Sequence, residues 1–374
     1  MSADPTLDGT VAGRAGPMDA LGELAGPGQT ANGQRHDTST GPSTHGHHAV
    51  APLPTTDRLA HQPAELPCST SPGLFGTSLE PVLRHACQGK LSQVTWFRTD
   101  WQRGGAVTGY ATYTDDQQQA HDVVVKLPVP PCERHWLTTL QPFGHVVPRV
   151  YAHGDVLGGY DLAWVVMERL PHGPLGPQWA GREFDLLAEA AGRFYAAARS
   201  IPPTGQPLAR DWIHLCHRAR ETARDHRLPD APRWRTALKK SQRKLKTWLE
   251  HWDNRPIDDW CHGDLHPGNA MVREPDGPAL LFDFAHTRVG HWVEDAVYFE
   301  HLFWARRDRL AGRKLCKQIA QERKRHHLPV DSNWPELAQT KRALLAMSAP
   351  AQLHQEGDPH HLQAALGILE AAVR

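Results

Sequence analysis

The chain has little that would direct it to a nucleic acid, a membrane or an oxidising compartment. Lys plus Arg and Asp plus Glu number 41 each in 374 residues, so no net charge attracts a polyanion. The six cysteines form no C-x-x-C pair, which argues against a zinc ribbon and a disulfide framework. No apolar run reaches the roughly 18 residues of a transmembrane helix, and the N-terminus lacks the pattern of a signal peptide. We therefore expect a cytoplasmic protein that binds neither nucleic acid nor membrane.

Aromatic residues are absent from the first 74 positions, where Gly, Pro, Ser, Thr, Ala and His dominate. A segment of this composition cannot bury enough apolar surface to offset the loss of chain entropy on folding. The sequence predicts a disordered tail over residues 1–74.

After Phe75 the composition becomes that of a folded chain. Apolar patterning predicts strands at 94–98, 108–113 and 122–127, a helix at 133–140, and strands at 147–151 and 164–167. Beyond Leu170 the apolar residues take helical spacing, with helices expected at 182–200, 237–252, 293–305, 313–325, 335–347 and 362–373. We expect an α+β protein with a small antiparallel sheet lobe over 75–169 and a helical lobe over 170–374.

The most specific motif lies in the second lobe. It places Asn269 five residues after Asp264, and Asp283 fourteen residues after Asn269. A carboxylate in a loop can reach a substrate hydroxyl, while an amide oxygen and a second carboxylate are hard ligands of the kind that Mg²⁺ prefers. Short strands at 270–272 and 280–282 would hold these ligands rigidly.

The stretch from His262 to Asn269 reads H-G-D-x-x-x-x-N and resembles the catalytic loop of the aminoglycoside phosphotransferase, choline kinase and related families. The resemblance implies a two-lobed protein-kinase-like fold and transfer of a phosphoryl group from ATP, or from GTP, to a hydroxyl of a small molecule. It implies that His262 buttresses the loop, and that Asp264 orients or deprotonates the acceptor hydroxyl. Asn269 and Asp283 would bind Mg²⁺, and the later Asp295 would be structural.

The first lobe carries further matches. Lys126 ends the stretch V-V-V-K-L and resembles the strand lysine that contacts the α- and β-phosphates in this fold. Glu133 resembles the helix glutamate that pairs with this lysine; the alternative is a solvated residue favoured by the helix dipole. Residues 164–170 resemble the linker that binds adenine, which assigns Met167, Glu168 and Leu170 to the nucleotide pocket. An ordinary buried strand would carry the same residues.

Two places depart from the family pattern. Gly104 and Gly105 lie where a phosphate-binding loop is expected, but no G-x-G-x-x-G is present, so a simple hairpin turn stays open. Ala285 stands two residues after Asp283, where such enzymes often carry an acidic residue or Gly.

Three other functions compete with a small-molecule kinase. A zinc site would use Cys261, His262, Asp264 and His266. Pro267 and the neighbouring glycines, however, prevent the two histidines from sharing a regular helix face. A protein kinase is disfavoured because H-G-D replaces H-R-D and no A-P-E element follows. A catalytically silent kinase-like binding protein stays open, although silent relatives usually lose one of the Lys, catalytic Asp and metal Asp, all present here.

The charge of residues 207–256 bears on the acceptor. This segment has thirteen Lys plus Arg against six Asp plus Glu, a difference of +7. A polycationic aminoglycoside would be repelled, whereas a neutral sugar or a hydroxyl compound with a carboxylate or phosphate would not. The alternative is that these residues form the solvated faces of helices.

Overall fold

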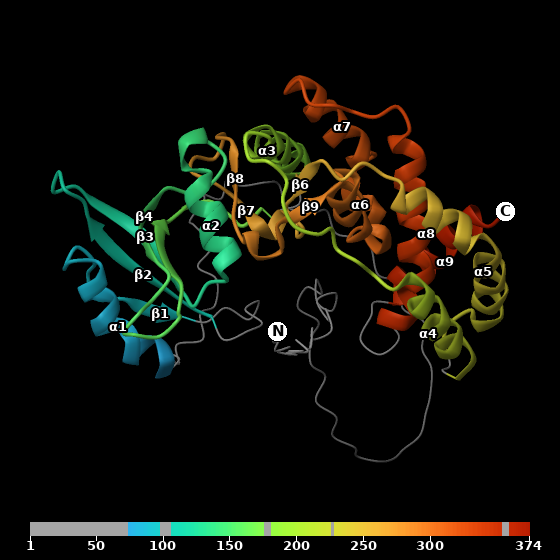
Figure 1. Cartoon of the computed structure of the whole chain (residues 1–374), viewed down its shortest axis with the longest axis horizontal. Coiled ribbons are helices and arrows are strands. Elements are labelled where there is room, and N and C mark those ends of the chain that lie inside the picture. Colours follow the sequence, from blue (N-terminus) through green and yellow to red (C-terminus); the bar gives the residue numbers. More distant parts are fainter. Residues whose placement is uncertain (1–73, 98–105, 176–180, 226–227, 354–358) are drawn as a thin grey trace, which may run out of the picture. The chain divides into compact units, whose positions relative to one another are not determined.

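The computed structural model describes residues 74–97, 106–175, 181–225, 228–353 and 359–374 (Figure 1). The tail predicted over residues 1–74 lies outside them, except for Leu74, and so do Gly104 and Gly105. Within these ranges, none of the helices combines the length and the apolar character needed to cross a membrane.

The first lobe is a five-stranded antiparallel sheet in the order β1-β2-β3-β5-β4 (Figure 1). Its elements are α1 Leu74–Ala86, β1 Thr95–Phe97, β2 Val107–Thr114, β3 Ala120–Leu127, α2 Pro131–Thr139, β4 Val150–Gly154 and β5 Trp164–Glu168. The β2–β3 pairing runs from Val107↔Leu127 to Thr114↔Ala120, which confirms the strands predicted at 108–113 and 122–127.

Alternation along β3 decides which face of the sheet carries the charged residues. Val125 and Leu127 are fully buried and belong to the same hydrophobic core as Leu83 of α1. Successive side chains of a strand point to opposite faces, so Lys126 points away from that core. On the opposite face it meets Glu133 of α2.

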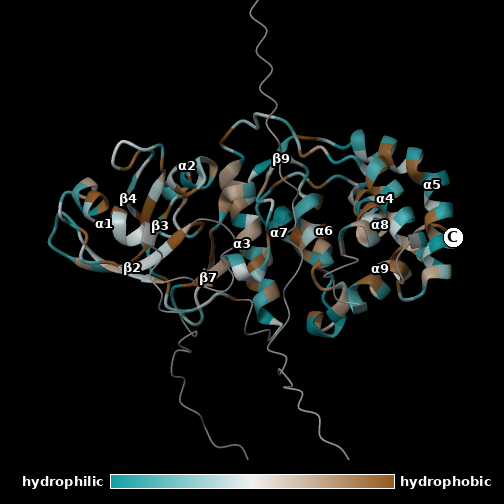
Figure 2. Cartoon of the chain, turned by 90° about the horizontal axis from the view of Figure 1, so that it is seen from below, coloured by the Kyte–Doolittle hydropathy of each residue, from teal (hydrophilic) through white to brown (hydrophobic). Residues whose placement is uncertain are grey.

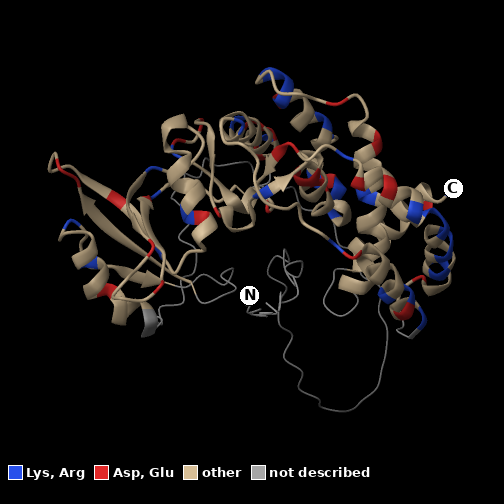
Figure 3. Ribbon diagram, in the orientation of Figure 1, with Lys and Arg blue, Asp and Glu red and all other residues tan. Residues whose placement is uncertain are grey.

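The second lobe is mainly helical. Its helices are α3 Arg182–Ala198, α4 Trp212–Asp225, α5 Ala231–Asp253, α6 Val293–His301, α7 Leu315–Arg325, α8 Trp334–Leu353 and α9 Pro359–Ala372. The hydropathy colouring of Figure 2 shows apolar and polar residues mixed along α5, which buries Leu238 and Leu245 on one side. Its exposed Lys and Arg residues appear blue in Figure 3.

Two small antiparallel pairs lie among these helices and flank the segment from His262 to Asp283. Strand β6 (Asp259–Cys261) pairs with β9 (Arg288–Gly290), and β7 (Ala270–Val272) pairs with β8 (Ala279–Leu281). Three short 3₁₀ helices, η2 Pro267–Asn269, η3 Phe284–His286 and η4 Trp304–Leu310, belong to this lobe, and η1 Gln141–Phe143 to the first. The predicted strand at 280–282 is thus β8, shifted by one residue.

Some elements differ from the sequence prediction. Helices α1 and α4 were not predicted: α1 contains Pro81, which argues against a helix, and the buried stripe of α4 includes small residues such as Ala219 and Ala223. The strand predicted at 147–151 begins only at Val150, because Pro148 has no N–H for a sheet ladder.

Candidate active site

Asp264 lies in the loop between β6 and η2, with both carboxylate oxygens engaged. Oδ1 accepts a hydrogen bond from the Tyr298 hydroxyl of α6 at 2.5 Å. Oδ2 accepts one from Asn269 Nδ2 at 3.0 Å and lies 3.5 Å from His266 Nε2. His266 Nδ1 accepts from the Gly268 amide, so its proton is on Nε2 and points to Asp264.

These partners keep the carboxylate ionised. Burial raises the pKa of Asp264, but the hydrogen bonds from His266 and Tyr298 lower it well below its ordinary value. Asp264 is therefore an anion at neutral pH, ready to accept a hydrogen bond from an acceptor hydroxyl.

His262 and Asp295 fix the backbone of this loop. His262 is fully buried; its Nδ1 accepts from the Asp264 amide at 3.3 Å, and its Nε2 donates to Phe282 O at 3.1 Å. Asp295, in the first turn of α6, accepts from the amides of His262 at 2.7 Å and Gly263 at 2.9 Å. His262 thus joins the loop to the residue before Asp283, and Asp295 holds the loop from the other side.

Asp283 follows β8 in a left-handed conformation, with φ 62° and ψ 61°. Its side chain is 38% exposed, and its Oδ1 lies 3.8 Å from Lys126 Nζ. Asn269 is buried, and its amide nitrogen is committed to Asp264, both to Oδ2 and to the backbone oxygen at 3.0 Å. The Asn269 Oδ1 atom is therefore the end of the amide that can bind a cation.

Lys126 is held between two carboxylates. Its Nζ donates to Glu133 Oε1 at 2.7 Å and Oε2 at 2.9 Å, and Glu133 is only 1% exposed. Burial lowers the pKa of Lys126, but the charges of Glu133 and Asp283 prevail and raise it. The interval of seven residues between lysine and glutamate is short, yet α2 starts soon enough after β3 to bring them together.

The linker after β5 is tied to the second lobe. Glu168 accepts two parallel hydrogen bonds from Arg273 in a bidentate ion pair, from Nε to Oε1 at 2.6 Å and from Nη2 to Oε2 at 2.7 Å. Met167 and Leu170 are each 9% exposed. The Glu168 side chain is thus committed to Arg273 and is not available to a ligand.

The zinc alternative finds no support in the geometry. Cys261 Sγ lies 3.4 Å from His291 O, and His262 Nε2 donates to a backbone carbonyl. Among the residues placed by the structure, there is no group of three or more His, Cys, Asp or Glu suited to a metal ion. A set of one amide oxygen and one carboxylate suits a cation such as Mg²⁺ that keeps other ligands from water or phosphate.

Sequence reasoning missed Tyr298, which donates a hydrogen bond to Asp264. Tyr298 comes three residues after Asp295, on the same face of α6, so that the helix presents both side chains to the loop. His266 was considered only as a zinc ligand, although its place within the motif puts it beside the carboxylate. The spacing i, i+3 from Asp295 is the signal that would have found Tyr298.

A family model described as the phosphotransferase enzyme family matches residues 103–339. The chain belongs to this family. Together with the observed sheet and helices, the match confirms the predicted two-lobed protein-kinase-like fold and makes the chain a phosphotransferase. A search of functionally curated proteins finds no match.

The phosphotransferase is also similar to solved structures of low identity. An aminoglycoside phosphotransferase from Alicyclobacillus acidocaldarius has 15% identity and a TM-score of 0.49, covering 76% of this chain and 91% of that chain. Macrolide 2'-phosphotransferase MphH from Brachybacterium faecium has 16% identity and a TM-score of 0.43, covering 79% and 98%. At such identities the likeness says nothing about the substrate of this chain.

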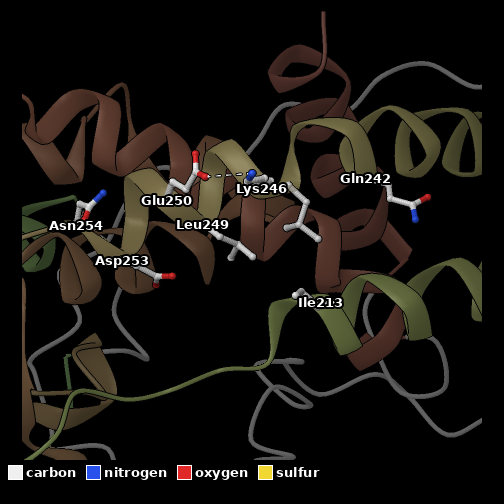
Figure 4. Close-up of a pocket in the computed structure, with 8 residues that line it drawn as sticks. Ile213, Gln242, Lys246, Leu249, Glu250, Asp253 and Asn254 are labelled. Carbon is white, nitrogen blue, oxygen red and sulfur yellow. Dashed lines mark ion pairs between the residues drawn. The ribbon is translucent and has the colours of Figure 1, made fainter.

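A groove of about 510 Å³ lies between α4 and α5 (Figure 4). It is lined by Ile213, Gln242, Leu245, Lys246, Leu249, Glu250, Asp253 and Asn254. Lys246 and Glu250 form an ion pair there at 3.8 Å, as Figure 4 shows. None of the motif residues lines the groove, so it has no part in the catalytic site.

Proposed function

We propose that this phosphotransferase moves the γ-phosphoryl group of ATP, or of GTP, to a hydroxyl of a small molecule, with Asp264 as catalytic base. The observation that carries the proposal is the convergence of four groups from separate elements: Asp264, Asn269, Asp283 and the Lys126–Glu133 pair. A silent kinase-like protein has no need for an ionised carboxylate held by three donors beside a metal-ligand pair.

The nucleotide would lie between the lobes. Lys126, kept cationic by two carboxylates, is suited to the α- and β-phosphates. The Glu168 and Arg169 amides are bonded to Arg149 O and Asp122 O, so the amide of Leu170 is the first beyond the sheet that can meet the adenine edge. Met167 would contribute apolar surface, and the segment with Gly104 and Gly105 would cover the phosphates.

The residues present fit a Mg²⁺ ion. Asn269 Oδ1 and the partly exposed carboxylate of Asp283 would hold it, next to Lys126. When bound, the ion neutralises charge on the β- and γ-phosphates.

Asp264 would act on the acceptor. Its carboxylate is fixed by Tyr298, Asn269 and His266, so it can orient the attacking hydroxyl and take its proton as the bond to phosphorus forms. His262 acts at a distance from the substrate, by holding the loop against Phe282. We further propose that the enzyme is cytoplasmic and binds neither nucleic acid nor membrane. We also propose that its acceptor is not a polycationic aminoglycoside.

The test is thermal stability with and without Mg–ATP or Mg–GTP, compared between wild type and Asp283→Ala. A ligand that binds only the folded state must raise the melting temperature. We expect a Mg²⁺-dependent rise for the wild type and its loss in the variant. No rise at millimolar nucleotide would favour the catalytically silent binding protein.

A further inference from the structure

We propose that the acceptor carries an anionic group, a carboxylate or a phosphate, bound by a cation cluster beside Asp264. The cation cluster consists of Arg210, Arg255, Arg288 and Lys341. The inference rests on the proposed function, because it assigns the second substrate of the same site. It concerns residues that the phosphoryl-transfer machinery leaves unused.

The cluster adjoins the catalytic loop. A Cβ added at Gly263, the residue before Asp264, would collide with Nη1 of Arg288. The positive charge of Arg210 acts on the hydroxyl of Tyr298, and this hydroxyl donates to Asp264. An anionic group bound here would therefore lie within the span of a small molecule whose hydroxyl is at Asp264.

The cluster holds more positive than negative charge. Its carboxylate is Glu294, whose Oε1 accepts from Arg255 Nε at 3.1 Å and Nη2 at 3.0 Å. Glu294 Oε2 lies 3.5 Å from Arg288 Nη2. Over the part of the chain that the structure describes, the side chains of Arg210 and Lys341 make no hydrogen bond or ion pair. Asp295 also acts on Arg288, so two carboxylates face four cations.

Lys341 is the most telling member, because it is buried without a hydrogen bond or ion pair to a carboxylate in the described chain. It is 7% exposed and lies between two indole rings, 5.1 Å from the centroid of Trp212 and 4.6 Å from that of Trp252. Burial lowers the pKa of Lys341 to about 7; Glu294 opposes this, while the arginines of the cluster reinforce it. A charge in this state is costly until an anion joins it.

Neighbouring polar atoms also lack partners. Arg288 Nε and His301 Nδ1 are buried and make no hydrogen bond within the described chain. His301 lies in α6. Burial lowers its pKa, and the positive charges of Arg210 and Lys341 lower it further. Buried polar atoms normally find partners, so these atoms favour a ligand that the protein itself does not supply.

The cluster is distinct from the exposed basic residues of α5. Lys246, for example, is 88% exposed on its side chain and lines the groove of Figure 4. Solvated lysines of this kind contribute little to binding, and they match the interpretation of residues 207–256 as solvated faces. Arg210 and Arg255 come from the same basic segment but turn inward.

The test uses inorganic phosphate as the probe, with the nucleotide site filled by saturating Mg–AMP-PNP. We expect phosphate to raise the melting temperature of the wild type further. Lys341→Met and Arg210→Gln should each weaken phosphate binding by roughly 30-fold or more, since each removes a desolvated cation. The matched control Lys246→Met removes a solvated lysine and should respond to phosphate as the wild type does.

The outcomes separate the two proposals. If Mg–AMP-PNP stabilises the protein but phosphate does not, or if Lys341→Met keeps the full response, the anion site is overturned while the kinase function stands. If Mg–AMP-PNP has no effect, the kinase function fails on its own, and a phosphate response that depends on Lys341 still supports the cluster.

A matched series then distinguishes the two anions. Glycerol, glycerate and glycerol 3-phosphate share three carbons and differ in charge. We expect glycerate or glycerol 3-phosphate to stabilise the wild type more than glycerol does, and the stronger of the two identifies carboxylate or phosphate. Equal stabilisation by all three would overturn the proposal.

Discussion

The catalytic loop and the cation cluster lie side by side but differ in how their charges are satisfied. In the loop, both oxygens of Asp264, both oxygens of Asp295 and both nitrogens of His262 have protein partners. In the cluster, Arg210 and Lys341 contact indole rings, but among the described residues their side chains have no hydrogen-bond or ion-pair partner. The protein therefore builds the loop by itself, whereas a partner from outside would complete the cluster.

Replacing the base gives the largest expected effect and tests the loop. Asp264→Ala should lower the rate of phosphoryl transfer by about 10²–10⁴, the usual contribution of a positioned acid or base. Asn269 would still donate to the backbone oxygen of residue 264, so the loop should keep its shape. The measurement is ADP release with an acceptor, and the stabilisation by Mg–ATP should persist. An unchanged rate would refute the assignment of the base.

Removing the hydroxyl of Tyr298 should have a smaller effect that depends on pH. The hydrogen bond from Tyr298 helps to lower the pKa of Asp264, so Tyr298→Phe should raise that pKa. A base is active when deprotonated, so the acid limb of the pH–rate profile should move to higher pH. Activity should fall several-fold at low pH and little above neutrality.

Tyr195→Phe is the matched control for this shift. Tyr195 also donates to a buried carboxylate, Asp295 Oδ2 at 3.0 Å, but that carboxylate only holds the backbone of the loop. Its removal should leave the acid limb in place. The same shift in both variants would mean that the limb reports loop stability and not the protonation of Asp264.

The same contrast explains how much the sequence could predict. Asp264, Asn269 and Asp283 lie within twenty residues of one another, and local strands and loops determine their relative positions, so the motif and its resemblance to the family could predict them as one group. The Lys126–Glu133 pair was also within reach, because both residues belong to one strand-helix unit. The predicted ends of strands were wrong where a single residue determines the end, as with Pro148 just before β4.

The acceptor side was not predictable in this way. Arg210 precedes α4, Arg288 begins β9 and Lys341 lies in α8, so tertiary packing alone brings them together. The excess charge of residues 207–256 indicated positive potential but mixed solvated residues such as Lys246 with inward ones. Net charge cannot separate the two, because the distinction depends on which helix face is buried.

The smallest expected effect tests whether Lys341 is a buried cation whose charge the protein leaves incompletely compensated. Its pKa falls from the ordinary 10.5 to about 7, so between these values the unfolded chain binds more protons than the folded one. This group therefore makes the wild type more stable as pH rises from about 7 to 10.5. Lys341→Met removes the dependence, so its melting temperature should exceed the wild-type value most at pH 7 and below.

Because other groups are common to both proteins, the difference between the two melting curves isolates Lys341. The difference in melting temperature between Lys341→Met and the wild type should shrink by several degrees from pH 7 to 10. The difference between Lys246→Met and the wild type should not change with pH, because Lys246 is exposed. A flat difference for Lys341→Met as well would mean that the protein already satisfies this charge. Adding phosphate at pH 7 should also shrink the difference in melting temperature. A bound anion would give Lys341 an ion-pair partner, just as the charged groups of the catalytic loop already have hydrogen-bond partners.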